Sequence, residues 1–345
     1  METKIWPQAT AGREQNQVIK EAAALLRDQQ VVAFPTETVY GLGADATSEE
    51  AVQRIFEAKG RPADNPLIVH VGERSQVEEL VTHIPEVAKQ LMDKFWPGPL
   101  TLVLPSNHQA ARNVTAGLNT VAIRMPDDPI ALALLKESGL PLAAPSANRS
   151  GRPSPTEADH VYQDLQGRIA GIVDGGPTGI GVESTVVDCA AEIPIILRPG
   201  GVTKEDIEPL VPDVIIDPAL ADQPGEQPKS PGMKYTHYAP EAPLWLIEGD
   251  DVFFREQLES MKEEGQRVAV IASQELAGQL NHEPVTVCGS RAQLTEVAGG
   301  LYRALRHYKK SEAEVILCES FPEYGVGAAI MNRLRKAATQ KIKQY

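Results

Sequence analysis

Two cations flank a glycine in the segment Lys59-Gly60-Arg61-Pro62, at the end of an expected helix. Because glycine commonly ends helices and Pro62 and Pro66 stiffen the loop that follows, Lys59 and Arg61 are held at one place. Two fixed cations suit the binding of an anionic group. Lys and Arg are also common at helix C-termini because they complement the helix dipole, and taken alone these residues favour that simpler explanation.

Two further arginines follow the same pattern. Arg124 and Arg198 each close a short apolar run, and all three arginines adjoin a loop and lie next to or near a proline. Each could form an ordinary surface ion pair, but the repetition favours the binding of an anion. A phosphate-bearing small molecule, oriented in a cleft by a few convergent polar groups, is the ligand that these residues suit.

Hydroxyl and amide side chains occur at neighbouring strand ends. Thr36, Thr38 and Tyr40 follow the apolar run 31–34, and Ser146 and Asn148 lie in the proline-restricted loop 145–155. These side chains can both donate and accept hydrogen bonds, which ligand recognition requires. Ser146 and Asn148 could equally serve only to stabilise a turn.

The elements that must position these side chains alternate along the chain. Periodicity predicts helices over 14–30, 48–58, 76–81, 86–95 and 157–165, and short apolar runs predict strands over 31–34, 67–71, 100–104, 120–124, 184–188 and 193–197. Proteins of the α/β class place ligands at such strand ends. His70 alternates with two valines in the run 67–71, and alone it is better explained as a hydrogen-bonded strand histidine than as a ligand group.

The chain divides into three parts by composition. Residues 1–217 form a first domain, and residues 218–243 form a linker rich in proline, too rich for a helix. Within this linker, Lys234, Tyr235, His237 and Tyr238 are clustered, which indicates a segment that packs on another surface. Residues 244–345 alternate strand and helix with short turns, which predicts a small parallel-sheet domain.

Composition excludes several classes of protein. With 345 residues, 42% hydrophobic and 23% charged, the chain is long enough for two ordinary globular domains. A net charge of -14 argues against a protein that coats nucleic acid electrostatically. Cys189, Cys288 and Cys318 lie in or beside apolar runs far apart, so we expect core thiols in a reducing compartment. No signal peptide or membrane span is evident, and we expect a cytoplasmic protein without membrane contact.

Several common catalytic motifs are absent from the sequence. It contains no G-x-x-x-x-G-K-[ST] phosphate loop, no H-E-x-x-H, no C-x-x-C and no G-x-S-x-G. P-loop ATPases, zinc hydrolases and α/β-hydrolases therefore lose support. What remains is a set of basic and hydroxyl groups distributed over strand ends.

Three motifs in this order resemble the YrdC-like domain of threonylcarbamoyl-AMP synthases: Phe34-Pro35-Thr36-Glu37-Thr38-Val39-Tyr40-Gly41-Leu42, Lys59-Gly60-Arg61-Pro62 and Pro145-Ser146-Ala147-Asn148-Arg149-Ser150-Gly151. The segment 231–240 and the second α/β domain resemble the longer, two-domain branch of that family. The likeness covers nearly the whole chain. It implies an N-terminal YrdC-like twisted mixed sheet with helices, followed by a smaller C-terminal Rossmann-like parallel α/β domain.

The resemblance also implies a reaction. ATP, L-threonine and bicarbonate or CO2 would give L-threonylcarbamoyladenylate and pyrophosphate, which supply the modification of an adenosine beside the anticodon of certain tRNAs. Mg²⁺ would enter with ATP, and no set of metal-ligating side chains is expected. The partners would be the threonylcarbamoyl-transfer proteins that use the product, with tRNA contacted only indirectly.

By this likeness the site residues fall into two sets. The residues that would line the threonine pocket are Thr38, His70, Arg124, Ala144 and Ser184. The residues that would hold ATP are Arg61, Asn65, Thr120, Ser146, Ser154, Arg198 and His237, with Lys59 and Arg61 as the catalytic cations and Asn148 and Tyr235 as further candidates. Ala144 can offer only its backbone and methyl group.

The chemistry agrees with these assignments. A threonine-derived carbamate attacking the α-phosphorus brings two anions together, so catalysis would rest on positioning and on neutralisation by Lys59, Arg61 and Mg²⁺. Arg124 matches the amino acid's carboxylate through a two-pronged contact that Lys could not make. No side chain stands out as the base that frees the threonine amine.

Two expectations concern parts of the chain. We expect the linker, through His237 and its neighbours, to fold over the ATP site and exclude water from a labile mixed anhydride. We expect Lys59→Ala to abolish adenylate formation while leaving the fold intact. Two alternatives remain at this point: a carbamoyl-transfer enzyme with another acceptor, and an RNA-binding module without catalysis.

Overall fold

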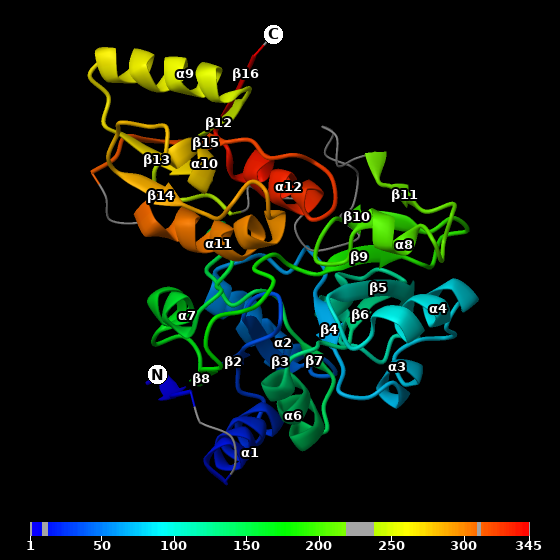
Figure 1. The fold of residues 1–345 in the computed structure, drawn as a ribbon. Coiled ribbons are helices and arrows are strands. Elements are labelled where there is room, and N and C mark those ends of the chain that lie inside the picture. Colours follow the sequence, from blue (N-terminus) through cyan, green and yellow to red (C-terminus); the bar gives the residue numbers. More distant parts are fainter. Residues whose placement is uncertain (1, 9–12, 219–237, 309–311, 345) are drawn as a thin grey trace. The chain divides into compact units, whose positions relative to one another are not determined.

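The structure is a computed structural model, and it describes residues 2–8, 13–218, 238–308 and 312–344 (Figure 1). The described residues form two compact units. Unit 1 comprises the residues up to 150, 154–179 and 183–218, and unit 2 comprises 151–153, 180–182 and the residues from 238 onward. Each unit has its own sheet and is described separately.

Unit 1 combines short strands with helices on both faces of its sheet. Its strands are β1 (Lys4–Trp6), β2 (Val32–Phe34), β3 (Gly41–Asp45), β4 (Ile68–His70), β5 (Leu100–Pro105), β6 (Thr120–Arg124), β7 (Leu142–Ala143), β8 (Gly171–Val173), β9 (Thr185–Asp188), β10 (Ile195–Arg198) and β11 (Ile215–Ile216). Its helices are α1 (Arg13–Arg27), α2 (Glu49–Lys59), α3 (Ser75–Glu78), α4 (Glu86–Phe95), α5 (Arg112–Thr115), α6 (Pro129–Ser138), α7 (Ala158–Leu165) and α8 (Lys204–Ile207).

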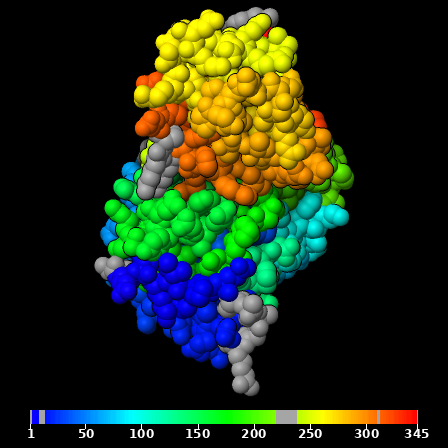
Figure 2. Space-filling view, turned by 60° about the vertical axis from the view of Figure 1, so that its left-hand side comes forward, coloured from blue at the N-terminus to red at the C-terminus, as the bar shows by residue number. Residues whose placement is uncertain are grey.

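The described strands of unit 1 form one mixed sheet in the order β1-β8-β2-β3-β7-β4-β6-β5-β9-β10-β11. The sheet contains both parallel pairs, such as β4 with β6, and antiparallel pairs, such as β5 with β6. The N-terminal strand β1 pairs with β8, and Figure 2 shows blue residues near the N-terminus bordering green residues from the middle of the chain. This architecture confirms the predicted mixed sheet.

Two hydrophobic cores lie on opposite faces of this sheet. Because side chains alternate along a strand, Val32 and Phe34 of β2 pack with α1 and α6, while Ala33 packs with α2 and α4. Helices α1 and α6 lie side by side (Figure 1). The sheet is therefore fixed from both sides, which holds its strand ends in place.

Helix α2 shows how the sequence sets an element boundary. Ser48 caps its start by accepting a hydrogen bond from the amide of Ala51, and Gly60 ends it with φ 64° and ψ 42°. The amide of Arg61 donates to the carbonyl of Phe56 at 3.0 Å, the six-to-one bond of a Schellman motif. The expected helix end is confirmed, and the residue after the left-handed glycine is turned back toward the helix.

Some elements of unit 1 were not predicted. Pro35, Gly41 and Gly43 favour a loop after the apolar run 31–34, but Gly41–Asp45 is strand β3, antiparallel to β2. Helix α6 was also missed, although Asp128 caps it, Pro129 begins it and Gly139 ends it in the left-handed region. These are ordinary start and stop signals, which hydrophobic periodicity alone does not reveal.

Unit 2 is built on an all-parallel sheet, as the alternation of elements predicted. Its strands, in sheet order, are β14 (Val285–Val287), β13 (Val268–Ala272), β15 (Val315–Glu319), β12 (Leu244–Glu248) and β16 (Gln340–Lys343). Its helices are α9 (Asp251–Glu263), α10 (Gln274–Ala277), α11 (Leu294–His307) and α12 (Gly327–Ala337). Figure 1 shows α9 on one face of the sheet and α11 and α12 on the other. Strand β16 was not predicted.

Two short stretches that lie between parts of unit 1 in the sequence, 151–153 and 180–182, belong to unit 2. Gly181 has φ 81°, and a Cβ there would lie 2.4 Å from the carbonyl oxygen of Ala298 in α11, so only glycine fits.

Tyr238, from the aromatic cluster of the linker, is buried in unit 2. It stacks on Tyr302 with ring centroids 5.5 Å apart, and the guanidinium of Arg333 lies 5.7 Å from its ring. The expectation that the aromatic cluster of the linker packs on another surface is confirmed for Tyr238.

The three cysteines are free and buried, which confirms the expectation of core thiols. Across the described ranges, no helix combines the length and apolar character needed to cross a membrane.

Candidate active site

The guanidinium of Arg124 lies at the centre of a group of polar side chains in unit 1. It ends β6, is 3% exposed, and donates from Nη1 to Thr38 Oγ1 at 3.0 Å and from Nε to the carbonyl of Gly98 at 3.3 Å. The strand and the loop after β2 thus hold this cation in one orientation. A buried, fixed guanidinium is suited to a carboxylate ligand.

The hydroxyls beside Arg124 have a definite hydrogen-bond direction. Thr36 Oγ1 donates to the carbonyl of Val39 at 2.7 Å and lies 2.9 Å from Thr38 Oγ1. Because the single proton of Thr36 goes to Val39, the proton of Thr38 goes to Thr36. Thr38 Oγ1 therefore accepts the hydrogen bond from Arg124. This bond fixes the loop 36–39 relative to the guanidinium.

His70 ends β4 directly beside Arg124, since the two residues are partners in the parallel ladder. Its ring lies edge-on to Phe34, with centroids 6.3 Å apart, and it is buried. Burial, and next the charge of Arg124, lower the pKa of His70 to about 3. The imidazole is therefore neutral at physiological pH and adds no charge to the group.

Ser184 connects the predicted threonine set to the predicted ATP set. Its hydroxyl lies 2.8 Å from Thr101 Oγ1, and Thr101 is the partner of Arg124 in the antiparallel ladder. Arg198 donates to the carbonyl of Ser184 from Nε at 3.1 Å and from Nη2 at 2.9 Å, and to its hydroxyl at 3.1 Å. The buried Arg198 is thus tied to the segment before β9.

Lys59 has a different setting from the solvated helix end that its neighbours alone indicated. It is 4% exposed, and its Nζ donates to the carbonyls of Ser146 at 2.5 Å and Asn148 at 2.7 Å. Ser146 Oγ in turn donates to Asn148 Oδ1 at 2.6 Å. The dipole explanation is therefore wrong for Lys59, because its amine holds the loop 146–148 that carries two other predicted residues.

The two groups lie on either side of one segment, residues 35–42. Its first part, through Thr38, meets Arg124. Its last part meets the loop of Ser146, since Ala147 donates to the carbonyl of Tyr40 at 2.8 Å and Leu42 donates to the carbonyl of Pro145 at 2.8 Å. The structure therefore brings the predicted threonine and phosphate residues to one region of the sheet.

Three more predicted ATP residues are buried in unit 1. Arg61 Nη2 donates to the carbonyl of Asn65 at 3.1 Å, and the Arg61 guanidinium lies 6.0 Å from the ring of Phe56. Ser154 donates to Glu183 Oε1 at 2.5 Å. Sequence reasoning did not single out Glu183, although it directly precedes Ser184.

Other predicted residues stand apart from these contacts. Thr120 begins β6, about 13 Å from Arg124 at the strand rise of 3.3 Å per residue, and its side chain bonds to no other predicted residue within the described ranges. Ala144 donates its amide to the carbonyl of Ile68 at 2.9 Å. His237 and Tyr235 lie outside the described residues.

Glu37 is the main residue that sequence reasoning missed. Its Oε1 lies 2.5 Å from Arg124 Nη2, and both side chains are largely buried, at 13% and 4% exposed. The residue stands inside the first of the three motifs, between Thr36 and Thr38. Its position in that motif could have marked Glu37 as a candidate site residue. Nothing in the sequence, however, indicates that it pairs with Arg124, which is distant along the chain.

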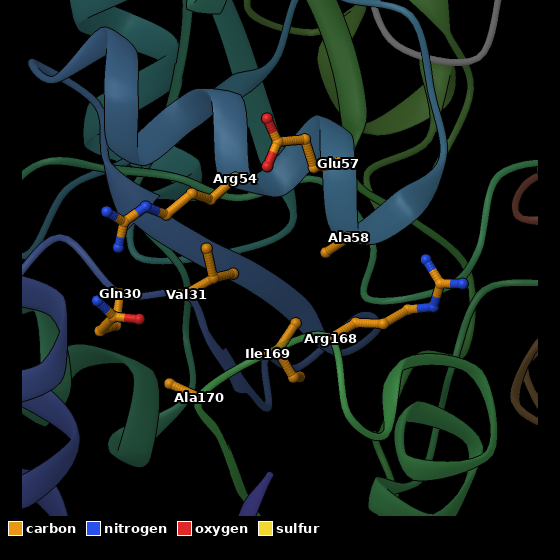
Figure 3. Close-up of a pocket in the computed structure, with 8 residues that line it drawn as sticks. All are labelled: Gln30, Val31, Arg54, Glu57, Ala58, Arg168, Ile169 and Ala170. Carbon is orange, nitrogen blue, oxygen red and sulfur yellow. The ribbon is translucent and has the colours of Figure 1, made fainter. Parts of the chain in front are cut away.

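A separate pocket of about 360 Å³ opens beside α2. Arg54 and Glu57 of α2 and Arg168 of the segment before β8 are among the residues that line it (Figure 3). Arg54 is bound to Glu50 at 2.7 Å, in an exposed pair. None of the residues predicted to bind ATP or threonine lines this pocket.

The described site residues can recognise anions and hydroxyls, and their chemistry is that of fixed cations and hydrogen-bond donors. Within the described ranges, no three His, Cys, Asp or Glu side chains come together to hold a metal ion.

Comparisons with known proteins cover both units. A family model described as telomere recombination matches residues 24–200. A second, described as the C-terminal domain of threonylcarbamoyl-AMP synthase, matches residues 202–339.

Individual relatives are similar over nearly the full length. The threonylcarbamoyl-AMP synthase of Bacillus subtilis (strain 168) is 59% identical over 325 residues, 94% of each chain. That of Pyrococcus abyssi is 50% identical over 328 residues, 94% of this chain and 95% of its own. Among solved structures, P. abyssi Sua5 complexed with L-threonine has a TM-score of 0.94 at 48% identity and covers 99% of this chain and 100% of its own.

Proposed function

The chain belongs to the family of threonylcarbamoyl-AMP synthases, and on that premise we propose that it makes L-threonylcarbamoyladenylate and pyrophosphate from ATP, L-threonine and bicarbonate or CO2. The observation that carries the proposal is the buried guanidinium of Arg124, fixed by Thr38 and Gly98 at a strand end. It offers a carboxylate one orientation. The solved relative complexed with L-threonine supports a carboxylate-bearing amino acid as its ligand.

In the proposed site the amino acid lies beside Arg124. Its carboxylate meets the guanidinium, and Thr38, neutral His70, Ala144 and Ser184 surround the rest. A neutral imidazole suits this place, because a second cation beside Arg124 would be repelled. The charge of Arg124 and the hydrogen bonds of these neighbours would therefore contribute to the selection of the amino acid.

The proposed nucleotide site lies across the segment 35–42. Lys59 and Arg61 provide positive charge, Asn65, Thr120, Ser146, Ser154 and Arg198 provide polar contacts, and His237 completes the set from outside the described residues. Attack of the carbamate oxygen on the α-phosphorus breaks the bond to pyrophosphate. Fixed cations lower the repulsion between the two reacting anions.

Lys59 has two roles in this proposal. Its amine holds the carbonyls of Ser146 and Asn148, and this bonding sets the shape of the loop. Its charge also lies where the phosphates are proposed to bind. The nucleotide and the loop then depend on the same side chain.

Mg²⁺ is proposed to arrive as part of the substrate, held by the phosphate oxygens of ATP. We also propose that the product passes to threonylcarbamoyl-transfer proteins for the modification of tRNA beside the anticodon. The cytoplasm is the proposed location, because three buried free thiols suit a reducing compartment.

Pyrophosphate release tests the proposal. Release from MgATP should require both L-threonine and bicarbonate, and omitting either should reduce it to background. Release that ignores both omissions would contradict the synthase reaction. A carbamoyl-transfer enzyme with another acceptor would release the same amount of pyrophosphate with and without threonine. An RNA-binding module would release no pyrophosphate under any condition.

A further inference from the structure

Glu37 and Arg124 form a buried ion pair without the alignment of a hydrogen bond. Glu37 Oε1 lies 2.5 Å from Arg124 Nη2. Within the described residues neither carboxylate oxygen of Glu37 has a hydrogen-bond partner of ordinary geometry, and neither does Arg124 Nη2. The remaining contacts of Arg124, to Thr38 and Gly98, are aligned. The pair therefore has charge balance but leaves hydrogen-bonding capacity unused on both sides.

A carboxylate whose task was to clamp Arg124 would accept aligned hydrogen bonds from it. Bidentate or aligned contact is the strong form of an arginine–carboxylate pair, and buried pairs offset their desolvation only when hydrogen bonds are satisfied. The contact between Glu37 and Arg124 lacks this hydrogen-bond alignment. Two acceptors shielded from water and without donors are best matched by a ligand that brings its own N–H groups.

The other charged groups near this pair are already accounted for. His70 is neutral, since its pKa is lowered to about 3 by burial and by Arg124. Asp128 uses its Oδ1 to accept the amides of Ile130 and Ala131 at 2.9 Å each, as the cap of α6. Glu37 is the carboxylate in contact with Arg124, and both of its oxygens are buried without an aligned donor.

We propose that the Glu37–Arg124 pair is the template for a zwitterion, with Arg124 taking the carboxylate of the bound amino acid and Glu37 taking its ammonium group. The inference rests on the proposed function and adds a specificity-determining residue to it. When the amino acid binds, Glu37 and Arg124 separate. Arg124 then contacts the ligand carboxylate, and Glu37 contacts the ligand ammonium group. No buried charge is left unpaired at either stage, which avoids the large cost of an isolated buried ion.

This arrangement has a measurable consequence for ligand selection. 2,3-Dihydroxybutanoate carries a hydroxyl where threonine carries its ammonium, so it offers the carboxylate to Arg124 and no cation to Glu37. The wild-type protein should bind threonine much more tightly than this analogue. Glu37→Gln keeps the shape of the side chain, removes its charge and should remove that preference.

The test compares the affinities of the full-length wild-type and variant proteins for both ligands by calorimetry. Glu37→Gln should weaken threonine about 30-fold or more, as for loss of one partner of a buried charge pair, and should leave the analogue unchanged or bound more tightly. Glu73→Gln, at an exposed position in the same unit, is the matched control and should change neither affinity. Glu37→Asp keeps the charge and should retain the preference for threonine, which supplies the test if Glu37→Gln does not fold.

The outcomes separate the alternatives. Equal weakening of both ligands would make Glu37 a clamp that only orients Arg124, and equal strengthening would make it a competitor for Arg124; either result overturns the inference. A wild-type protein that binds threonine and the analogue equally also overturns it, while the proposed function stands. A wild-type protein that binds no threonine contradicts the proposed function itself, and the inference falls with it.

Discussion

Individual residues of this site owe their chemistry to burial. His70 would titrate near 6.5 in an unfolded chain, but burial and then the charge of Arg124 lower its pKa to about 3 in the folded protein. Lys59 and Arg124 are held in the interior by hydrogen bonds to carbonyl and hydroxyl oxygens. The same residue types on the surface would be solvated and would not discriminate between ligands.

The depressed pKa of His70 predicts a pH dependence of stability. Between about pH 6.5 and 3 the unfolded state binds a proton that the folded state does not, so stability is fully present above 6.5 and falls as the pH is lowered. The loss should be about 1.4 kcal/mol per pH unit, or about 2 kcal/mol from pH 6.5 to 5. Urea unfolding of the wild type and His70→Gln checks this, because the variant should lack that part of the slope.

The exposed His83 offers the control for this measurement. His83→Gln should keep the wild-type slope. An identical slope in wild type and His70→Gln would mean that His70 titrates alike in both states.

Lys59→Ala should reduce adenylate formation at least about 100-fold, the scale for loss of a group that stabilises transition-state charge. The contacts of Lys59 change the expectation that the variant keeps the stability of the wild-type protein. Because the buried carbonyl of Asn148 and the partly buried carbonyl of Ser146 lose their donor, the free energy of unfolding should also fall, by about 1–3 kcal/mol for the buried group. Pyrophosphate release and urea unfolding measure the two effects, and a variant with wild-type stability would show that water replaces the amine.

Prediction at this scale was limited by contacts between distant residues. The family resemblance placed Lys59 and Arg124 in a site, but nothing local in the sequence shows that Lys59 bonds to Ser146 and Asn148, or that Glu37 contacts Arg124. These contacts join residues more than eighty positions apart. Local patterns carry no information on such pairs, so the sequence indicated a surface cation where the structure has an internal one.

Secondary-structure elements position the site through their ends. Arg124 ends β6 and His70 ends β4, and the parallel pairing of these strands places them side by side. These strands were predictable because short apolar runs bounded by turn residues mark them. Strand β3 was not, because Gly41 and Gly43 resemble loop residues, although a Cβ at Gly43 would lie 2.7 Å from the ring of Phe34.

Gly60 tests the role of the α2 end. It has φ 64°, and a Cβ added there would meet no atom within 4 Å, so substitution meets backbone strain and no steric clash. Gly60→Ala should lower the free energy of unfolding by about 1–2 kcal/mol, the cost of the left-handed conformation. It should also weaken ATP binding, because Lys59 and Arg61 flank the turn.

Gly278 provides the comparison, since it ends α10 with φ -65°. Gly278→Ala should be neutral or stabilise the protein slightly, because Ala adopts that conformation without strain. Equal effects at the two glycines would show that the left-handed turn does not matter.

The described residues form two units with different sheets, and two family models together match residues 24–200 and 202–339. The alternation of strands and helices made the parallel sheet of unit 2 predictable. The assignment of residues 151–153 and 180–182 to unit 2 was not predictable, because short loops carry no periodicity that indicates where they pack.

The predicted lid can be tested at this scale. Deleting the chain from Ser230 onward should lower the yield of adenylate more than it lowers the affinity for threonine, because the labile anhydride would then be exposed to water. Threonine affinity measured on the same protein shows whether unit 1 remains folded. Equal losses in yield and affinity would count against a lid.

The proposed reaction joins threonine, bicarbonate and AMP into one product, and the mass of that product reveals all three. The decisive measurement is the mass spectrum of the adenylate formed from MgATP, L-threonine and ¹³C-bicarbonate. We expect threonylcarbamoyladenylate carrying the label, which is lost when unlabelled bicarbonate is used. An adenylate without the label, or no adenylate from a folded protein, would contradict the proposed reaction.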